Sequence, residues 1–162
     1  MLFDTHAHFD DPQFDADRDE VLRGLKDLGV GKVMDIGASL DTTRKAIEIA
    51  EKYDFVYATA GVHPSETVGM TEEDMEELRR LALSSPKVRA IGEIGLDYHY
   101  EDTNPEEQQH WFRWQLELAK ELDIAENEVA QALDAVCAPV SLFDPVYSDG
   151  GDPLTVMDQV KD

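Results

Sequence analysis

The chain has 162 residues, of which 42% are hydrophobic and 31% are charged, a balance typical of a folded domain rather than a disordered protein. Its 14 basic and 36 acidic residues give a formal net charge of −22, so the chain repels phosphate backbones and any chemistry on nucleic acid requires cations. A single cysteine, Cys137, excludes an internal disulfide, and because we find no signal-type leader or membrane-length apolar run, we expect a cytoplasmic protein without a membrane partner.

Strands and helices are predicted in regular alternation over the first part of the chain. Four short apolar runs predict strands: residues 2–9, 30–39, 55–64 and 88–98. After the first run, a helix that stops before Gly29 is predicted by apolar residues at helical spacing: Val21, Leu22, Leu25 and Leu28. After the second run, the helical stripe is formed by Ala46, Ile49, Ala50 and Tyr53.

The third and fourth helices carry start signals as well as apolar stripes. Thr71 and Asp74 stand at the N-cap and N3 positions of a capping box, ahead of a stripe formed by Met75, Leu78 and Ala82. Asn104 and Pro105 mark the start of the fourth helix, whose row of inward-facing residues is Trp111, Gln115, Leu118 and Leu122.

This alternation predicts an α/β fold with a parallel sheet, either open and doubly wound or closing into a TIM-type barrel. The four strands alone leave both alternatives open. A closed barrel needs eight such units and typically about 250 residues. The chain is therefore expected to contain a truncated TIM-type barrel, with four βα units in residues 1–122.

The pattern changes in residues 123–162, where a fifth strand is expected but no suitable apolar run occurs. Asp123 and Glu126 resemble a helix start, followed by an apolar stripe formed by Val129, Ala132, Leu133 and Val136. The remaining residues are interrupted by prolines and glycines and carry many acidic side chains. This second part is predicted to be a short helix followed by an irregular acidic tail.

Two histidines and a glutamate are the candidate metal ligands. His6 and His8 stand two residues apart on a predicted strand, so their imidazoles point to the same face and can bind one metal ion. Glu93 lies between glycines at the carboxyl end of the fourth predicted strand, where ligand-binding groups collect in α/β barrels. Two imidazoles and a carboxylate suit Zn²⁺, Mn²⁺ or Mg²⁺. The alternatives are a hydrogen-bonded pair of histidines and a glutamate that only marks a strand end.

Further polar residues follow the predicted strand ends. His63, in "GVHP", is expected either to contact a substrate or a metal ligand, or to cap a turn. Asp97, His99 and Tyr100 follow the fourth strand on the same rim. His110 lies on a predicted helix away from any strand end, so it is assigned no chemistry.

The motifs "DTHAHFD", "GVHP" and "GEIGLDYH", with the helix "EQQHWFRWQLELAKEL", occur in this order within residues 1–122. In these motifs the sequence resembles the TatD family of metal-dependent hydrolases and deoxyribonucleases. The resemblance implies an amidohydrolase-type barrel, two divalent ions (Mg²⁺, Mn²⁺ or Zn²⁺) and hydrolysis of phosphodiester bonds in DNA. By position, it implies that His6 and His8 bind one ion, that Glu93 bridges two, and that His63 lies near the site.

The same resemblance implies further metal-binding histidines on later strands and a catalytic aspartate near the end of the barrel. No histidine follows His110, so none of these later ligands is assigned and the catalytic residue is left unknown. We therefore expect an incomplete site with impaired hydrolysis, and we leave open whether the chain is an active enzyme. The unpaired strands at both sheet edges are expected to favour self-association.

The stretch "EVAQALDAVCAPVSLFDPVYSDGGDPLTVMDQV" resembles region 3 of sporulation-type RNA polymerase sigma factors, over residues 123–162. This resemblance implies RNA polymerase as a partner and a chimeric chain with a junction near residues 119–126. Two alternatives to an enzyme follow: a binding protein that uses this segment, or a fragment without a selected function.

Overall fold

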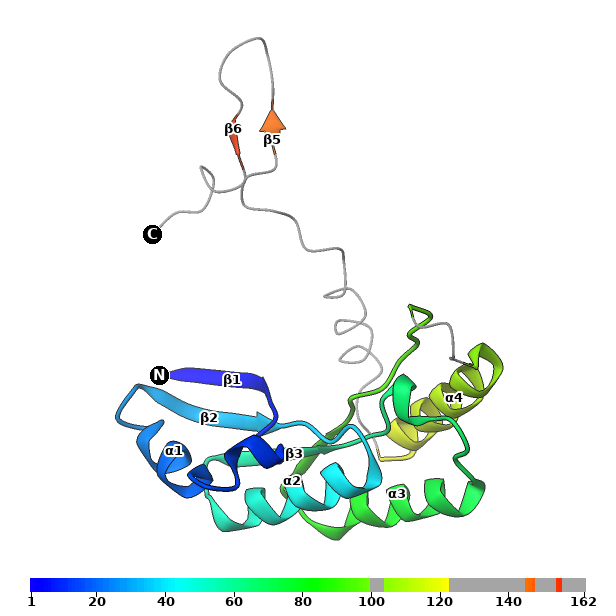
Figure 1. Ribbon diagram of the computed structural model, residues 1–162, viewed down its shortest axis with the longest axis horizontal. Helices are drawn as coiled ribbons and strands as arrows, with labels where there is room; N and C mark the ends of the chain where they lie inside the picture. Colours follow the sequence, from blue (N-terminus) through cyan, green and yellow to red (C-terminus); the bar gives the residue numbers. More distant parts are fainter. Residues whose placement is uncertain (100–103, 123–144, 148–153, 156–162) are drawn as a thin grey trace. The chain divides into compact units, whose positions relative to one another are not determined.

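A computed structural model of the chain describes residues 1–99, 104–122, 145–147 and 154–155 (Figure 1). The chain divides into two compact units, Met1–Ile124 and Ala125–Asp162. In the second unit, β5 (Pro145–Tyr147) and β6 (Leu154–Thr155) form a short antiparallel pair. The first unit contains β1 (Leu2–Ala7), η1 (Pro12–Phe14), α1 (Arg18–Gly24), β2 (Val30–Asp35), α2 (Leu40–Lys52), β3 (Val56–Ala60), η2 (Pro64–Glu66), α3 (Glu72–Ser84), β4 (Val88–Ile91) and α4 (Pro105–Glu121).

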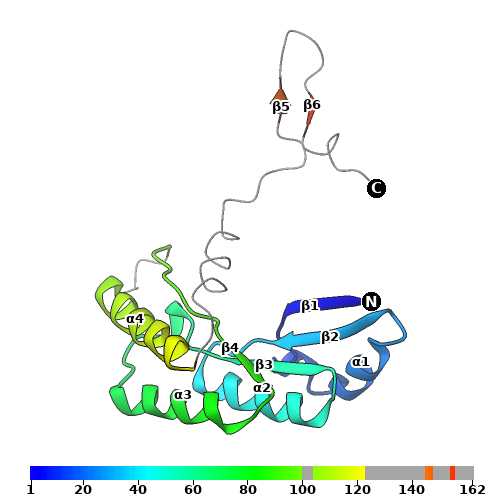
Figure 2. The ribbon, with the colours of Figure 1, turned by 180° about the vertical axis from the view of Figure 1, so that it is seen from behind.

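The first unit is built on a parallel sheet with strand order β1-β2-β3-β4. Each strand pairs with the next strand along the chain, and the helices α1, α2 and α3 run along one side of the sheet (Figures 1 and 2). A doubly wound sheet reverses its strand order at a switch point, whereas a barrel adds each strand beside the last. The predicted α/β fold is confirmed, and the strand order is that of a barrel.

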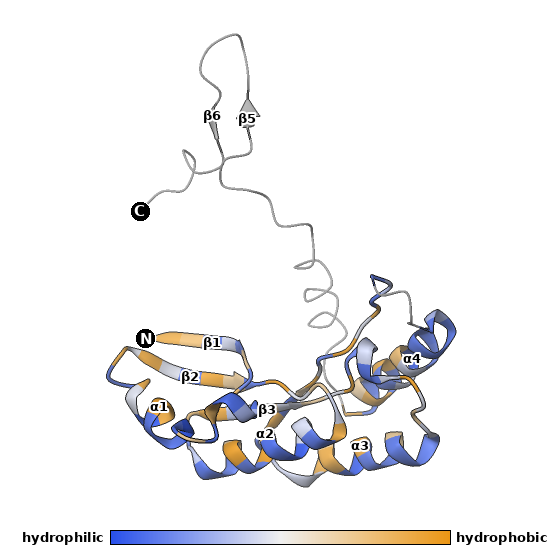
Figure 3. Cartoon of the chain, viewed as in Figure 1, coloured by the Kyte–Doolittle hydropathy of each residue, from blue (hydrophilic) through white to orange (hydrophobic). Residues whose placement is uncertain are grey.

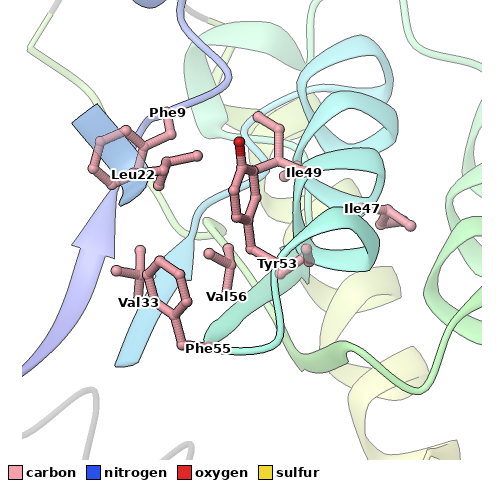
Figure 4. Close-up of a cluster of buried hydrophobic side chains, with 11 residues drawn as sticks. Phe9, Leu22, Val33, Ile47, Ile49, Tyr53, Phe55 and Val56 are labelled. Carbon is pink, nitrogen blue, oxygen red and sulfur yellow. The ribbon is translucent and has the colours of Figure 1, made fainter. Parts of the chain in front are cut away.

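The core lies between the sheet and its helices, in two clusters of buried side chains. Hydrophilic and hydrophobic residues alternate around α2 and α3 (Figure 3), as the predicted stripes require. Every residue of those two stripes is buried. The first cluster lies between β2, β3 and α2 and includes Phe9, Leu22, Val33, Ile49, Tyr53 and Val56 (Figure 4). The second lies between β3, α3 and α4 and includes Val62, Met75, Leu78, Trp111 and Leu118.

The helix starts follow the capping residues in the sequence. The Thr71 hydroxyl accepts the Asp74 N–H, and the Asp74 carboxylate accepts the Thr71 N–H, so the predicted capping box is confirmed. The Asn104 side chain accepts the N–H groups of Glu106 and Glu107 at the start of α4, with Pro105 at the first helical position. Unpaired N–H groups at these helix ends are thereby satisfied.

Several predicted boundaries are wrong, because each of the four predicted strands ends earlier than expected: β1 at Ala7, β2 at Asp35, β3 at Ala60 and β4 at Ile91. The first helix ends at Gly24 rather than at Leu28, which is 77% exposed. Glycine is a poor helix former, and the chain leaves the helix through successive turns that close at Gly29 with a φ of 85°. The fourth strand ends at Ile91, so Glu93 lies in the loop just after the strand.

The outer edges of the sheet are open among the residues that the structure describes, since neither β1 nor β4 has a second pairing strand there. Leu2 and Phe3 of β1 are 67% and 48% exposed. The predicted helix after Asp123, most of the acidic tail and Tyr100 lie outside the described residues. In the described part of the chain, no helix has the length and apolar character needed to cross a membrane.

Candidate metal centre

The structure brings together the three side chains that the sequence singled out. One ligand atom from each of His6, His8 and Glu93 lies within 4.8 Å of the others. The Nε2 atoms of His6 and His8 are 3.2 Å apart, and His6 Nε2 is 3.7 Å from a carboxylate oxygen of Glu93. The two histidines lie at the carboxyl end of β1, and Glu93 follows the carboxyl end of β4.

The spacing of these atoms suits a divalent metal ion. Zinc binds imidazole nitrogens at about 2.0–2.1 Å, so two such nitrogens at tetrahedral or octahedral angles lie roughly 2.9–3.4 Å apart. The observed 3.2 Å between the two Nε2 atoms falls within this interval. The same distance also suits a hydrogen bond between the two rings, but that bond would not need a carboxylate beside it. The donor set is thus compatible with Zn²⁺, Mn²⁺ or Mg²⁺.

The backbone around Glu93 is fixed by contacts with the ends of β2 and β3. Its N–H donates to the carbonyl oxygen of Gly37 at 2.7 Å, and the N–H of Gly92 donates to that of Ala60 at 2.9 Å. A Cβ atom on Gly61 would lie 2.3 Å from the carbonyl carbon of Gly92. Glycine at position 61 therefore lets the two backbones approach closely.

The segment that carries His8 is also held rigidly. The carboxylate of Asp35, at the end of β2, accepts the N–H of Phe9 at 2.7 Å. The guanidinium group of Arg18 donates to the carbonyl oxygens of Phe9 and Asp11 at 2.5 and 3.0 Å. These bonds fix the chain directly after His8. Neither Asp35 nor Arg18 was expected from the sequence. Asp35 lies 26 positions from Phe9, and the contacts of Arg18 with residues nine and seven positions away depend on the turns after β1.

Two buried carboxylates lie behind His8. Asp10 is 4% exposed and Asp35 is fully buried. Burial, together with the neighbouring charge of Asp10, raises the pKa of Asp35 to about 6, and the hydrogen bond from Phe9 opposes this rise. Burial also raises the pKa of Asp10, while the imidazole of His8 opposes that rise. One oxygen of each carboxylate has no hydrogen-bond partner among the described residues.

The raised pKa of Asp35 predicts how the stability of the metal-free chain depends on pH. Between about pH 4 and pH 6 the folded chain retains a proton that an unfolded aspartate has released, so the free energy of unfolding falls as the pH rises through this window. The shift corresponds to roughly 3 kcal/mol at most. Urea unfolding of the wild type and of Asp35→Asn, measured from pH 4 to pH 7, should show the smaller decline in the variant.

The comparison between the two proteins isolates Asp35 from other acids. Four carboxylates on the surface, two of them half-buried, have lowered pKa values because they pair with cations or with a helix N-terminus: Asp15, Asp19, Asp74 and Glu77. Their contributions to stability are lost only as the pH falls through these lowered values. Equal pH dependence in the wild type and Asp35→Asn would contradict the assignment.

His63 lies outside the three-residue group and caps a turn. Its Nδ1 accepts the N–H of Ser65 at 3.2 Å and lies 2.8 Å from the Ser65 hydroxyl, at the start of η2. A neutral ring with Nδ1 as acceptor carries its proton on Nε2. The capping alternative is therefore present, and a role toward substrate stays a prediction. On α4, His110 pairs with Glu72 at 3.4 Å.

Two buried glutamines of α4 position the loops after β3 and β4: Gln115, which the sequence places in the inward-facing row of the helix, and Gln108, which was not expected to have a role. Gln115 accepts the N–H of Val62 at 2.8 Å and donates to its carbonyl oxygen at 3.1 Å. Gln108 makes the same pair of bonds with Asp97, at 2.8 and 2.7 Å. Each amide thus satisfies both the N–H and the carbonyl group of one loop residue. In the sequence, the signals were the place of Gln115 in the inward-facing row and the seven-residue spacing that puts Gln108 on the same helix face.

Comparison with known proteins places this architecture in a family. The family model described as TatD related DNase matches residues 3–126. An uncharacterized metal-dependent hydrolase of Bacillus subtilis, YabD, is 43% identical over 124 residues, covering 76% of this chain and 48% of that protein. The 3'-5' ssDNA/RNA exonuclease TatD of Cronobacter sakazakii is 37% identical over 144 residues, covering 89% of this chain and 54% of that protein.

The solved structures agree with the sequence comparisons. The crystal structure of the TatD homologue YjjV from Escherichia coli K12 superposes with a TM-score of 0.70 at 35% identity, covering 75% of this chain and 48% of that one. A TatD family hydrolase from Entamoeba histolytica gives a TM-score of 0.68 at 30% identity, covering 74% and 46%. The chain thus spans about half the length of the relatives it matches. By the extent of the family match, this chain belongs to the TatD related DNases.

Proposed function

We propose that this chain carries part of a divalent-metal-dependent hydrolase that acts on phosphodiester bonds of nucleic acids. The observation that carries the proposal is the convergence of His6, His8 and Glu93 from opposite edges of the sheet to within 4.8 Å. Family membership supports metal-dependent hydrolysis, and the exonuclease named among the relatives supports a single-stranded DNA or RNA substrate.

The three ligands define what the site does in this proposal. A bound ion lowers the pKa of a water molecule and stabilises charge on phosphoryl oxygens. His6 and His8 supply neutral nitrogen ligands, and the second carboxylate oxygen of Glu93 is available for a second ion. With a net charge of −22, the chain depends on bound cations to approach a nucleic acid, so its affinity for substrate falls when the metal is removed.

His63 is proposed to contact the substrate. Because its Nδ1 is used by the turn after β3, its Nε2–H remains a hydrogen-bond donor for a phosphate oxygen. No residue of this chain is assigned as the catalytic group. The ligands that the family resemblance places on later strands have no counterpart assigned here, so hydrolysis by this chain alone is proposed to be slower than by relatives of twice its length.

A nuclease assay tests the proposal. The purified chain is incubated with a 5'-labelled single-stranded DNA and with an RNA oligonucleotide, in Mg²⁺, Mn²⁺ or Zn²⁺ or in excess chelator. We expect slow, metal-dependent cleavage that His6→Ala and Glu93→Ala each reduce to background. Cleavage that persists in chelator, or that survives both substitutions, would overturn the assignment of the site.

The second part of the chain supplies an alternative proposal, binding of RNA polymerase by residues 123–162. The alignment with the Cronobacter exonuclease favours nuclease parentage for some of this segment, because a match covering 144 of 162 residues cannot end before residue 144. The test is the capture of purified RNA polymerase by the full chain, compared with the chain truncated after Leu122. Capture by the full chain alone would support polymerase binding, and capture by neither would exclude it.

Self-association through the open edges of β1 and β4 is proposed on physical grounds. Unpaired N–H and carbonyl groups on an edge strand are a template for pairing with another strand. Sedimentation of the full chain across a range of concentrations should show reversible oligomers. A monomer at every concentration would exclude this pairing.

A further inference from the structure

The imidazole of His8 lies between the candidate metal centre and a buried carboxylate. Its Nε2 atom is 3.2 Å from Nε2 of His6, on the side where the ligand atoms converge. Its Nδ1 atom is 3.6 Å from Oδ1 of Asp10. The two nitrogens of one ring are therefore directed at two different partners.

The carboxylate of Asp10 lacks a donor for the oxygen that approaches His8. Asp10 is 4% exposed, and its Oδ1 has no hydrogen-bond partner within the part of the chain that the structure describes. A buried carboxylate oxygen without a donor is costly, and such atoms are rare in folded proteins. A charge-assisted bond to an imidazole N–H is about 2.7–2.9 Å long, so a movement of about 0.8 Å closes the gap.

The segment around Asp10 limits how far this carboxylate can turn away from His8. The residue before it is held on both sides, since the Phe9 N–H donates to Asp35 and the Phe9 carbonyl oxygen accepts from Arg18. The N–H of Asp11 donates to the carbonyl oxygen of His8 at 3.2 Å, which closes the turn. Asp10 thus lies on a fixed backbone behind the ring.

We propose that Asp10 is a positioning residue for His8, accepting the Nδ1–H of the imidazole so that the Nε2 lone pair is directed toward the metal centre. The proposal rests on the proposed metal site and adds the group that sets the orientation and tautomer of one ligand. Outer carboxylates of this kind raise the basicity of a metal-binding histidine. Asp35 acts one step further back, by anchoring the backbone between His8 and Asp10.

The proposal fixes the protonation pattern of the metal-free site. With its proton on Nδ1, His8 can only accept at Nε2, so His6 must carry a proton on Nε2 to donate across the 3.2 Å between the rings. The two histidines are therefore expected to be opposite tautomers. A metal ion that binds both Nε2 atoms requires only His6 to change its tautomer.

Nitrogen-15 NMR of the histidine rings tests this pattern without any metal. Spectra are recorded in excess chelator at pH 8, with each ring assigned by substituting the five histidines in turn. We expect His8 to be predominantly the Nδ1–H tautomer in the wild type and to lose that preference in Asp10→Asn and Asp10→Ala. Asp41→Asn removes the same charge from a 95% exposed carboxylate and should leave His8 unchanged.

Metal affinity provides the second readout. Calorimetric titration with Mn²⁺ should give a dissociation constant roughly 10–100-fold higher for Asp10→Asn than for the wild type, and within twofold of the wild type for Asp41→Asn. If the wild type shows the expected tautomer but binds no metal, the proposed metal site is rejected, whereas the proposed hydrogen bond between Asp10 and His8 is retained. If wild-type His8 carries its proton on Nε2, the positioning role is overturned, whatever the affinity. That measurement does not depend on whether an Asp10 variant folds.

Discussion

Replacing Glu93 with glutamine should lower the affinity of the chain for Mn²⁺ or Zn²⁺ by at least roughly 100-fold, more than is typical of a residue that acts only through a ligand. Glutamine keeps the size of the side chain but loses the charge that offsets the cation. His6→Ala should have an effect of similar size, because it leaves a single imidazole at the site. Calorimetric titration of the metal-stripped proteins measures both dissociation constants.

A second histidine and glutamate pair in the same chain provides the matched control. His110, on α4, has its Nε2 atom 3.4 Å from a carboxylate oxygen of Glu72, on α3, and both residues are exposed. This distance is similar to the 3.7 Å between His6 Nε2 and a carboxylate oxygen of Glu93. The surface pair has no third ligand atom near it among the described residues. Glu72→Gln and His110→Ala should leave metal affinity within about twofold of the wild type. Equal losses from both pairs would mean that the acidic surface binds cations without a defined site.

Replacing Gln115 with methionine should destabilise the chain by roughly 2–4 kcal/mol. The substitution keeps the length and hydrophobic contacts of the side chain but leaves the N–H and carbonyl groups of Val62 without partners. Each buried backbone group that loses its hydrogen bond costs about 1–3 kcal/mol. Urea unfolding, followed by the fluorescence of Trp111 and Trp114 on the same helix, measures the change.

Gln109 provides the control for this substitution, since it lies on the same helix but is only partly buried. Its side chain contacts Tyr98 and Arg113 on the surface, without pairing to a backbone group. Gln109→Met is expected to change stability by less than about 0.5 kcal/mol. A Gln115→Met variant as stable as Gln109→Met would show that Val62 finds other partners, and that α4 does not fix the loop leading to His63.

Local patterns in the sequence were enough to predict most elements of the first unit. The capping box joins Thr71 to Asp74, three residues later, and the Asn104 cap joins Asn104 to residues two and three positions later. Such short-range signals do not depend on the tertiary fold, so they can be recognised from the sequence alone. The helix containing Leu22 was predicted too long, because its apolar spacing continues past Gly24 although the backbone turns there. The choice between an open sheet and a barrel required the strand order, which no local pattern contains.

The grouping of the three candidate ligands was predictable from the sequence, whereas the residues that fix the backbone around them were not. His6 and His8 were expected to share a face because they stand two residues apart on one predicted strand, although β1 ends at Ala7, one residue before His8. Glu93 was expected beside them because parallel strands end at one rim. Asp35 and Gln115 bond to residues 26 and 53 positions away, so the sequence shows them only as polar residues in apolar runs. The pairing of Asp10 with His8 had a local signal, their two-residue spacing, which the sequence analysis did not use.

The central claim is that His6, His8 and Glu93 together bind a divalent ion. The most direct measurement is an anomalous difference map from crystals of the chain grown with Mn²⁺. We expect one peak within about 2.0–2.3 Å of both Nε2 atoms and of a Glu93 carboxylate oxygen. A map with no peak there at saturating Mn²⁺, and with the two histidines hydrogen-bonded to each other, would contradict the claim.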